Sequence, residues 1–251
     1  MRNLIAAIAL SVAAAIAFAS PAMAGNLKLQ DQVLSATVQL NGNCSGTVIH
    51  SKRDEKSGDV RTVVLTAAHC VDQSMQKDQD VDLPVYQGNR VVKKERYIGR
   101  VIGKYYKRDL ALIELKDKDT LFQKVARIAE AEPAVAMGDY VITVGYPGGM
   151  GLTITEGLFG SYETIDYPSA GTEYFRATPD ITGGNSGGAM YQVTAAGDYR
   201  LIGVTTAVWR CCNFMGLYTP AAEIHAYLKT ALPEAIGIDP TRTATTSPGG
   251  K

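Results

Sequence analysis

Short apolar segments, separated by turns that contain Gly, Asp and Asn, recur from residue 36 to residue 218. Segments this short and this closely spaced predict β-strands rather than helices. The first series comprises residues 36–40, 45–50, 60–65, 90–102 and 110–115. We interpret the polar stretch 116–124 as a crossover to a second series at 125–128, 138–145, 152–155, 173–177, 188–192, 200–207 and 216–218. The pattern favours a pair of β-barrels.

Three short motifs lie in order along the chain, and each supplies one part of acyl-transfer chemistry. They are Thr-Ala-Ala-His-Cys at 66–70, Asp-Leu-Ala-Leu at 109–112 and Gly-Asn-Ser-Gly-Gly at 184–188. A serine hydroxyl is protonated at neutral pH and needs a base before it can attack a carbonyl. His69 can serve, because the unperturbed imidazole pKa lies near working pH. Asp109 would fix its tautomer. Glycines beside Ser186 would leave room for the substrate carbonyl and allow a tight turn with inward N–H groups.

These motifs and their order resemble the chymotrypsin/trypsin-like family, specifically its secreted bacterial branch, which includes glutamyl endopeptidase-like enzymes. Asn-Cys-Ser-Gly-Thr at 43–47 and Gly-Tyr-Pro-Gly at 145–148 add to the resemblance, which spans most of the mature chain. It implies an all-β fold of two six-stranded antiparallel β-barrels with a C-terminal helix. It also implies a triad of His69, Asp109 and Ser186 and an oxyanion hole formed by the backbone N–H groups of Gly184 and Ser186.

The resemblance implies a serine endopeptidase that acts on protein or peptide substrates, without a cofactor or metal. Two alternatives stay open: a catalytically silent, protease-like binding protein, and an esterase that uses the same acyl-enzyme path. An α/β-hydrolase is disfavoured, because its nucleophile prefers a Gly-x-Ser-x-Gly turn and its histidine follows the serine. His225 does follow Ser186, but it falls in an amphipathic helix predicted at 221–232 and reads as a surface or boundary residue.

The N-terminal segment predicts export, and the C-terminal segment predicts a flexible tail. Arg2 precedes an uncharged apolar stretch, and Ala22-Met23-Ala24 offers a cleavage site, so residues 1–24 read as a signal peptide and the mature chain would begin at Gly25. A membrane anchor is the alternative, although the apolar stretch is short for one. We expect a protease domain at 25–237, with barrel one at about 25–115 and barrel two at about 125–220, and a flexible tail at 238–251. The protein would be secreted or periplasmic.

Charge and cysteine content narrow the partners further. Without Arg2 the chain has 24 basic and 25 acidic side chains. This balance does not favour a nucleic acid or a membrane surface as partner. Cys44 and Cys70 flank the strand and turn that deliver His69, and the family resemblance implies that they form a disulfide. The adjacent pair Cys211 and Cys212 could form a strained ring, stay reduced or bond another chain, and no family role transfers to it.

Residues that would bind substrate can be counted from the motifs. Asp180 lies six residues before Ser186, an offset at which trypsin-like digestive enzymes bind basic side chains; the alternative is an Asp that caps a turn with Thr182. The alignment implied by the second-barrel segments places the following residues at the pocket edge: Thr205, Thr206, Ala207 and Val208. None is the histidine that glutamyl endopeptidases use, which argues against glutamate specificity, and Val208 would favour smaller side chains.

Two further features bear on activation and on metals. Asn185 stands where digestive relatives have an aspartate that receives a new N-terminal ammonium, so we expect the oxyanion loop to be ordered without that cleavage. Asp78, Asp80 and Asp82 alternate after the histidine motif, where some relatives bind calcium. Their spacing lacks the glycine of a calcium loop, and we expect a solvated acidic loop there.

Overall fold

The computed structural model describes residues 28–72, 77–88, 90–166, 169, 171–208 and 215–237. The expected signal peptide at 1–24, the mature start at Gly25, the tail at 238–251 and the cysteines 211 and 212 lie outside the described residues. In the part that is described, no helix is long and apolar enough to cross a membrane.

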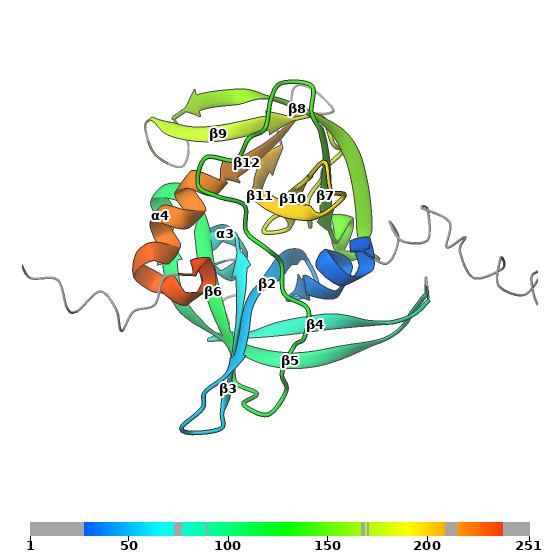
Figure 1. Cartoon of the computed structure of the whole chain (residues 1–251), viewed down its shortest axis with the longest axis vertical. Coiled ribbons are helices and arrows are strands. Elements are labelled where there is room, and N and C mark those ends of the chain that lie inside the picture. The colour runs from blue at the N-terminus through cyan, green and yellow to red at the C-terminus, as the bar shows by residue number, and fades with distance from the viewer. Residues whose placement is uncertain are drawn as a thin grey trace, which may run out of the picture.

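Twelve described strands form two closed antiparallel β-barrels, one above the other in Figure 1. The first barrel comprises β1 (Thr37–Leu40), β2 (Cys44–Arg53), β3 (Val60–Thr66), β4 (Asp78–Gln87), β5 (Arg90–Tyr105) and β6 (Leu110–Leu115), in the order β1-β2-β3-β6-β5-β4. The second comprises β7 (Tyr140–Gly145), β8 (Thr153–Ile165), β9 (Thr172–Ala177), β10 (Ala189–Val193), β11 (Tyr199–Val208) and β12 (Gly216–Pro220), in the order β10-β11-β12-β9-β8-β7. The predicted fold class is confirmed.

Helical segments are short and surround the barrels. Residues 28–32 are α-helical and lead through η2 (Leu34–Ala36) into β1. The chain then contains α3 (Ala68–Asp72), η3 (Tyr106–Arg108), η4 (Pro147–Gly149), α4 (Ala221–Ala231) and η5 (Pro233–Ile236). Ile224 and Leu228 of α4 are fully buried, which explains why the amphipathic pattern at 221–232 correctly predicts this helix.

Each barrel closes around side chains that alternate along its strands. In the first, Leu40, Leu65 and Ile113 are fully buried, and the cluster continues across the seam into Val144 of the second barrel. The second barrel has its own aromatic centre, in which the rings of Phe159 and Phe175 meet edge to face with centroids 5.1 Å apart. Continuous packing across the seam fixes the two barrels relative to each other, and the site lies on that seam.

Strand β4 corrects the expectation of a solvated acidic loop at 78–82. Gln79 and Val81 are fully buried, so the acidic residues between them occupy the other face of a strand. Each acid there contacts a basic side chain: Asp78 contacts Lys116 at 2.7 Å, and Asp82 and Asp80 contact Arg96 at 2.7 and 3.5 Å. The period of two was present in the sequence, but the high density of aspartate concealed it.

Two segments of the second series also differ from expectation. Residues 125–128 form no strand, and Ile128 makes only an isolated bridge to Leu201. The segment expected at 152–155 is the start of β8, which continues to Ile165. Most of β8 alternates between half-buried and exposed residues, so its second half offers too few apolar side chains to mark it as a strand.

Candidate active site

His69 and Asp109, the expected base and carboxylate, come from the first barrel. His69 lies in α3, directly after β3, and Asp109 lies between η3 and β6. Asp109 has φ +52, a left-handed conformation that is uncommon outside glycine and that Asp tolerates better than most residues. Because β3 pairs with β6 from Thr66↔Ala111 to Val63↔Glu114, the two residues leave adjacent strands at the same end of the barrel. The register therefore brings together two side chains that lie forty positions apart.

The Asp109 carboxylate is bound to His69 through both of its oxygens. Oδ1 accepts the backbone N–H of His69 at 2.9 Å, and Oδ2 lies 2.8 Å from ring Nδ1. An ionised carboxylate only accepts hydrogen bonds, so Nδ1 carries the proton and Nε2 is left unprotonated in the neutral ring. The Asp109 side chain is 6% exposed and that of His69 27%, so the carboxylate is shielded while the ring reaches solvent.

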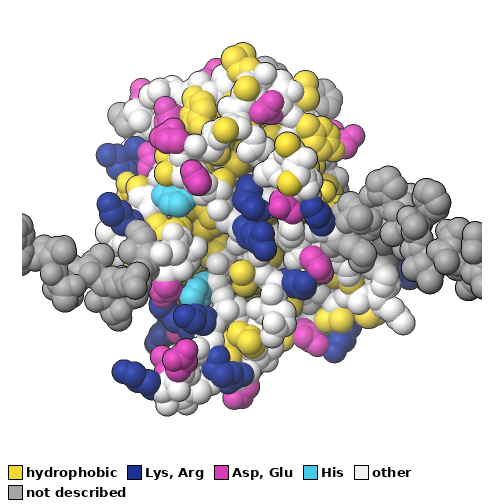
Figure 2. All heavy atoms as spheres, viewed as in Figure 1, with side chains coloured by type: hydrophobic (Ala, Val, Ile, Leu, Met, Phe, Trp, Pro, Cys, Tyr) yellow, Lys and Arg dark blue, Asp and Glu magenta, His cyan; other side chains and the backbone are white. Residues whose placement is uncertain are grey.

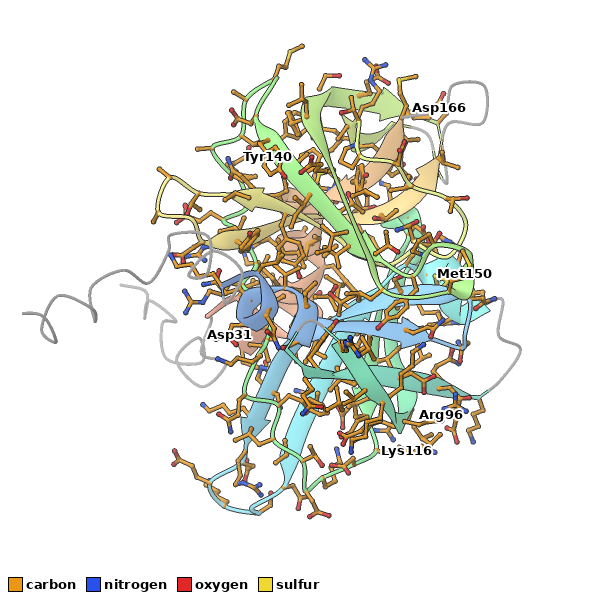
Figure 3. All side chains as sticks on the ribbon, turned by 90° about the vertical axis from the view of Figure 1, so that its right-hand side faces the viewer. Asp31, Arg96, Lys116, Tyr140, Met150 and Asp166 are labelled. Atoms are coloured by element: carbon orange, nitrogen blue, oxygen red, sulfur yellow. A yellow bond between two sulfur atoms is a disulfide. The ribbon has the colours of Figure 1, made fainter. Side chains whose placement is uncertain are left out.

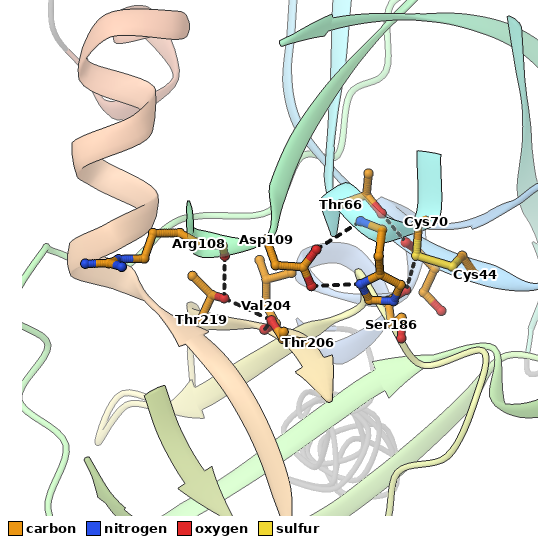
Figure 4. Close-up of polar contacts among 11 residues, drawn as sticks. Cys44, Thr66, Cys70, Arg108, Asp109, Ser186, Val204, Thr206 and Thr219 are labelled. Carbon is orange, nitrogen blue, oxygen red and sulfur yellow. Dashed lines mark hydrogen bonds and ion pairs between the residues drawn. A yellow bond between two sulfur atoms is a disulfide. The ribbon is translucent and has the colours of Figure 1, made fainter. Parts of the chain in front are cut away.

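Ser186 comes from the second barrel, from the loop between β9 and β10. Its carbonyl accepts the backbone N–H of Ser45 at 2.8 Å, a bond that crosses the seam. Figure 4 shows Ser186 beside the imidazole that contacts Asp109. No hydrogen bond between the ring and the Ser186 hydroxyl is formed among the described residues. In proteases without substrate this bond is often long, and it tightens when the substrate binds.

The turn before Ser186 presents two unused N–H groups. The Gly183 carbonyl accepts the Gly148 N–H at 2.6 Å, and Gly184 has φ +99. Because C=O and N–H point in opposite directions across one trans peptide, the Gly184 N–H points away from Gly148. Neither this N–H nor that of Ser186 has an acceptor in the described part of the chain. The sequence-predicted oxyanion residues therefore lie in a conformation that can receive an oxyanion.

Asn185 holds the same turn locally. Its backbone N–H donates to the Thr182 carbonyl, and its side-chain Oδ1 accepts the Thr182 N–H, both at 3.1 Å. It is 2% exposed. A neutral amide thus occupies the position at which an aspartate would require a buried ammonium, as expected from the sequence.

A pocket of about 290 Å³ opens beside Ser186. It is lined by Ile181, Thr182, Gly183, Ser186, Thr205, Ala207 and Val208. The structure therefore brings Thr205 and Val208 to the pocket, as the sequence predicts. Val208 is 38% exposed at the edge, whereas the Thr205 hydroxyl is buried and forms no hydrogen bond with any residue that the structure describes.

Asp180 and Thr206 lie elsewhere. Asp180 is exposed, is not among the described lining residues, and uses its backbone carbonyl to accept the Thr155 hydroxyl at 2.8 Å. The Thr206 hydroxyl lies 2.9 Å from that of Thr219, which donates to the carbonyl of Arg108, the residue before Asp109 (Figure 4). Thr206 is thus linked through Thr219 to the backbone just before Asp109 and is not among the described residues that line the pocket.

Comparison with known proteins places the chain in a family. A family model described as "Trypsin" matches residues 28–228. The chain belongs to the trypsin family. The solved structure of Rv3671c from M. tuberculosis H37Rv, the inactive form of a serine-to-alanine mutant, is similar in fold, with a TM-score of 0.59 and 20% identity over 84% of this chain and 93% of that one.

Curated relatives of this trypsin-family chain are named as bacterial proteases. It is 38% identical over 114 residues to a probable serine protease do-like of Buchnera aphidicola (45% of this chain, 22% of that protein). It is 30% identical over 114 residues to the periplasmic serine endoprotease DegP of Escherichia coli K12 (45% of this chain, 23% of that protein). The matched part is less than a quarter of each relative's length.

Ser45 is a site residue of this trypsin-family chain that sequence reasoning passed over. Its hydroxyl donates to the Gly184 carbonyl at 2.7 Å and accepts the Tyr146 N–H at 2.8 Å. It is fully buried and joins the first barrel to the oxyanion turn. The motif at 43–47 was the available signal, but a sequence does not show which of its five residues reaches the other barrel.

The glycines beside Ser186 also allow close packing within the protein itself. A Cβ at Gly184 would lie 2.2 Å from the Tyr146 carbonyl oxygen, and one at Gly187 would lie 2.1 Å from the Thr66 hydroxyl. The expectation that a side chain would crowd the substrate carbonyl stays a prediction, and the structure adds crowding of the protein's own backbone and side chains. The two glycines let the nucleophile turn pack directly against its neighbours.

The disulfide between Cys44 and Cys70 is present, as the resemblance implied. Cys70 Sγ lies 3.4 Å from the Ser186 carbonyl oxygen, so the bridge packs against the nucleophile's backbone. Both cysteines lie within 4.8 Å of His69, a grouping that could suggest a metal. Because both sulfurs are bonded to each other, they offer no thiolate ligand.

Proposed function

We propose that this protein is a serine endopeptidase in which Ser186 is the nucleophile, His69 the general base and acid, and Asp109 the residue that orients the imidazole. The observation that carries the proposal is the doubly bound Asp109–His69 pair beside Ser186, next to two backbone N–H groups that have no acceptor among the described residues. Each group has the polarity that its role needs, and the three come from two barrels that a continuous core holds together.

The reaction follows from these positions. His69 Nε2 takes the Ser186 proton as Oγ bonds to the substrate carbonyl carbon, and the carbonyl oxygen gains charge that the N–H groups of Gly184 and Ser186 stabilise. The imidazolium is stabilised by Asp109 and returns its proton to the amine as the C–N bond breaks. Water then attacks the acyl-enzyme with His69 again as base, which releases the acid and restores Ser186.

The pocket supports an uncharged P1 residue of small or medium size. None of the described lining residues carries a charge, and Ile181, Ala207 and Val208 supply apolar walls. Asp180 is exposed and outside that lining, which gives no support for a basic P1 residue. The described lining also holds no histidine, which gives no support for glutamate or for the glutamyl endopeptidase-like branch.

Export and activation complete the proposal. The apolar leader and the names of the relatives as periplasmic proteases support a secreted or periplasmic protein that is cleaved before Gly25. The turn at 182–186 is held by Asn185 and Gly148, and the neutral Asn185 amide carries no charge that would pair with a new N-terminal ammonium, which supports activity without zymogen cleavage. Figure 2 shows acidic and basic side chains interspersed over one face, consistent with peptide rather than nucleic-acid partners.

The test is hydrolysis of a P1-varied fluorogenic peptide library by the chain from Gly25, beside Ser186→Ala. We expect cleavage after uncharged residues that Ser186→Ala abolishes, while Ser57→Ala, at an exposed hairpin, cleaves like the wild type. An esterase would turn over the matched ester but not the amide. A silent binding protein would turn over neither and would still bind the peptide.

A further inference from the structure

We propose that Gln39 is a positioning residue for the oxyanion hole and that Lys94 sets the orientation of its amide; this inference rests on the proposed function. Gln39 lies on β1 of the first barrel and is 3% exposed. Its side chain reaches the turn η4 of the second barrel, 110 residues away in sequence. None of the three acyl-transfer motifs contains Gln39.

The contacts of η4 show why this turn matters. Its Gly148 N–H holds the Gly183 carbonyl at 2.6 Å, which orients the Gly184 N–H toward the oxyanion position. Gly184 packs so closely on the turn that an added Cβ would lie 2.8 Å from the Gly148 nitrogen and 3.0 Å from the Gly149 nitrogen. A shift of η4 by a few tenths of an ångström therefore moves the oxyanion donor.

Gln39 holds the other side of η4. Its Nε2 donates to the Gly149 carbonyl at 2.7 Å and to the Gly42 carbonyl at 3.1 Å. The two backbones approach closely there, since a Cβ at Gly149 would lie 2.2 Å from the Gly42 oxygen. Two carbonyl oxygens that converge repel each other, and an NH₂ group with two hydrogens stabilises both. The amide thus joins the first barrel to η4, which in turn holds the Gly183 carbonyl.

Lys94 fixes which way this amide points. Its Nζ lies 2.5 Å from Gln39 Oε1 and 5.2 Å from the centroid of the Tyr146 ring, at the start of the same turn. An ammonium can only donate, so the Gln39 oxygen faces Lys94 and the NH₂ faces the two carbonyls. Figure 3 shows Met150, which follows η4, at the edge where the barrels meet, with Arg96 of β5 below it. The β4–β5 hairpin is therefore connected to η4 through Lys94 and Gln39.

The decisive substitution is Gln39→Glu, which keeps the size but replaces the NH₂ donor with an acceptor. Lys94→Met leaves Gln39 in place but frees its amide to reorient, and Lys94→Arg restores a donor. The matched control is Gln32→Leu. Gln32 also makes two side-chain hydrogen bonds, to Asp198 at 3.1 Å and from the Tyr199 N–H at 2.8 Å, and neither of them involves η4.

Each variant is assayed for kcat and KM per titrated active site, for inhibition by a peptide boronic acid, and for Tm. A boronate adduct on Ser186 places an oxygen in the oxyanion hole, so it reports the hole itself. Removal of one oxyanion donor costs about 100- to 1000-fold in kcat, so a displaced donor is expected to cost about 10- to 100-fold in Gln39→Glu. The boronate Ki is expected to rise by a similar factor, while KM changes little.

We expect a smaller loss in Lys94→Met, recovery in Lys94→Arg, and wild-type kcat in Gln32→Leu. A Gln39→Glu enzyme with a lowered Tm but kcat and boronate Ki within about twofold of wild type would show a purely structural role and overturn the inference. An equal kcat loss in Gln32→Leu would overturn it as well. If the wild type neither cleaves peptide nor binds boronate, it is the proposed function that fails.

Discussion

Gly187 and Gly58 allow the crowding of the nucleophile turn to be measured separately from backbone strain. Both have a left-handed φ, +81 and +78 respectively. A Cβ at Gly58 would have nothing within 4 Å, whereas one at Gly187 would lie 2.1 Å from Thr66 Oγ1 and 2.3 Å from the Ser45 carbonyl oxygen. Alanine at either site carries the same conformational cost, and only Gly187→Ala adds collisions.

The shared cost of left-handed alanine is about 1–2 kcal/mol. At Gly187 the new methyl group must also separate Thr66 from Ser45, whose hydroxyl-to-carbonyl hydrogen bond is 2.8 Å and buried. Overpacking of this kind costs about 1–3 kcal/mol, and loss of the buried hydrogen bond costs about 1–3 kcal/mol more. Gly187→Ala should therefore lower the free energy of unfolding by about 2–6 kcal/mol more than Gly58→Ala does.

The assay is urea unfolding of both variants in a Ser186→Ala background, which prevents self-cleavage. The reference is the same background with both glycines intact. If the two alanine variants differ by less than about 0.5 kcal/mol, the close packing of the nucleophile turn is refuted.

Three other outcomes are expected. Ser45→Ala leaves the Gly184 carbonyl and the Tyr146 N–H without a buried partner, so urea unfolding should show a loss of about 2–4 kcal/mol against about zero for exposed Ser57→Ala; equal losses contradict this. Replacing Cys44 and Cys70 by alanine releases a loop of sequence separation 26 and should lower the free energy of unfolding by about 3–4 kcal/mol; an unchanged Tm contradicts it. Burial lowers the pKa of His50 below 6.5, so the folded state resists protonation. Stability should therefore fall as pH drops from about 6.5 through the lowered pKa, and unfolding measured across that range in His50→Gln should lack this part of the fall.

The motifs predicted the parts of the site that depend on residue type and local order. His69 and Asp109 lie together because they flank adjacent strands of the first barrel, whereas Ser186 lies in the loop between β9 and β10, which packs against the Cys44–Cys70 disulfide. The strand pattern alone gave five segments and then seven, so the two six-stranded barrels followed from the family resemblance rather than from the spacing. The catalytic roles assigned to His69, Asp109 and Ser186 stay predictions.

The parts that sequence missed depend on distance in space. Gln39 meets Gly149 only because the two barrels close against each other, and no local pattern links positions 110 residues apart. Asp180 has the expected offset from Ser186, but its backbone carbonyl accepts the Thr155 hydroxyl and the residue is exposed. Strand β4 was missed because every second residue at its start is an aspartate, a residue type that is typical of loops. The ion pairs that these aspartates form cannot be seen in the sequence.

The most direct test of the central claim is the attachment of a serine-directed fluorophosphonate to the chain from Gly25, mapped by peptide mass spectrometry. The account predicts a single label on Ser186, formed much more slowly in His69→Gln and Asp109→Asn because the base is lost or misoriented. Rapid labelling of another serine, or labelling of Ser186 at an unchanged rate without His69, would contradict the assignment of these three residues as a catalytic unit.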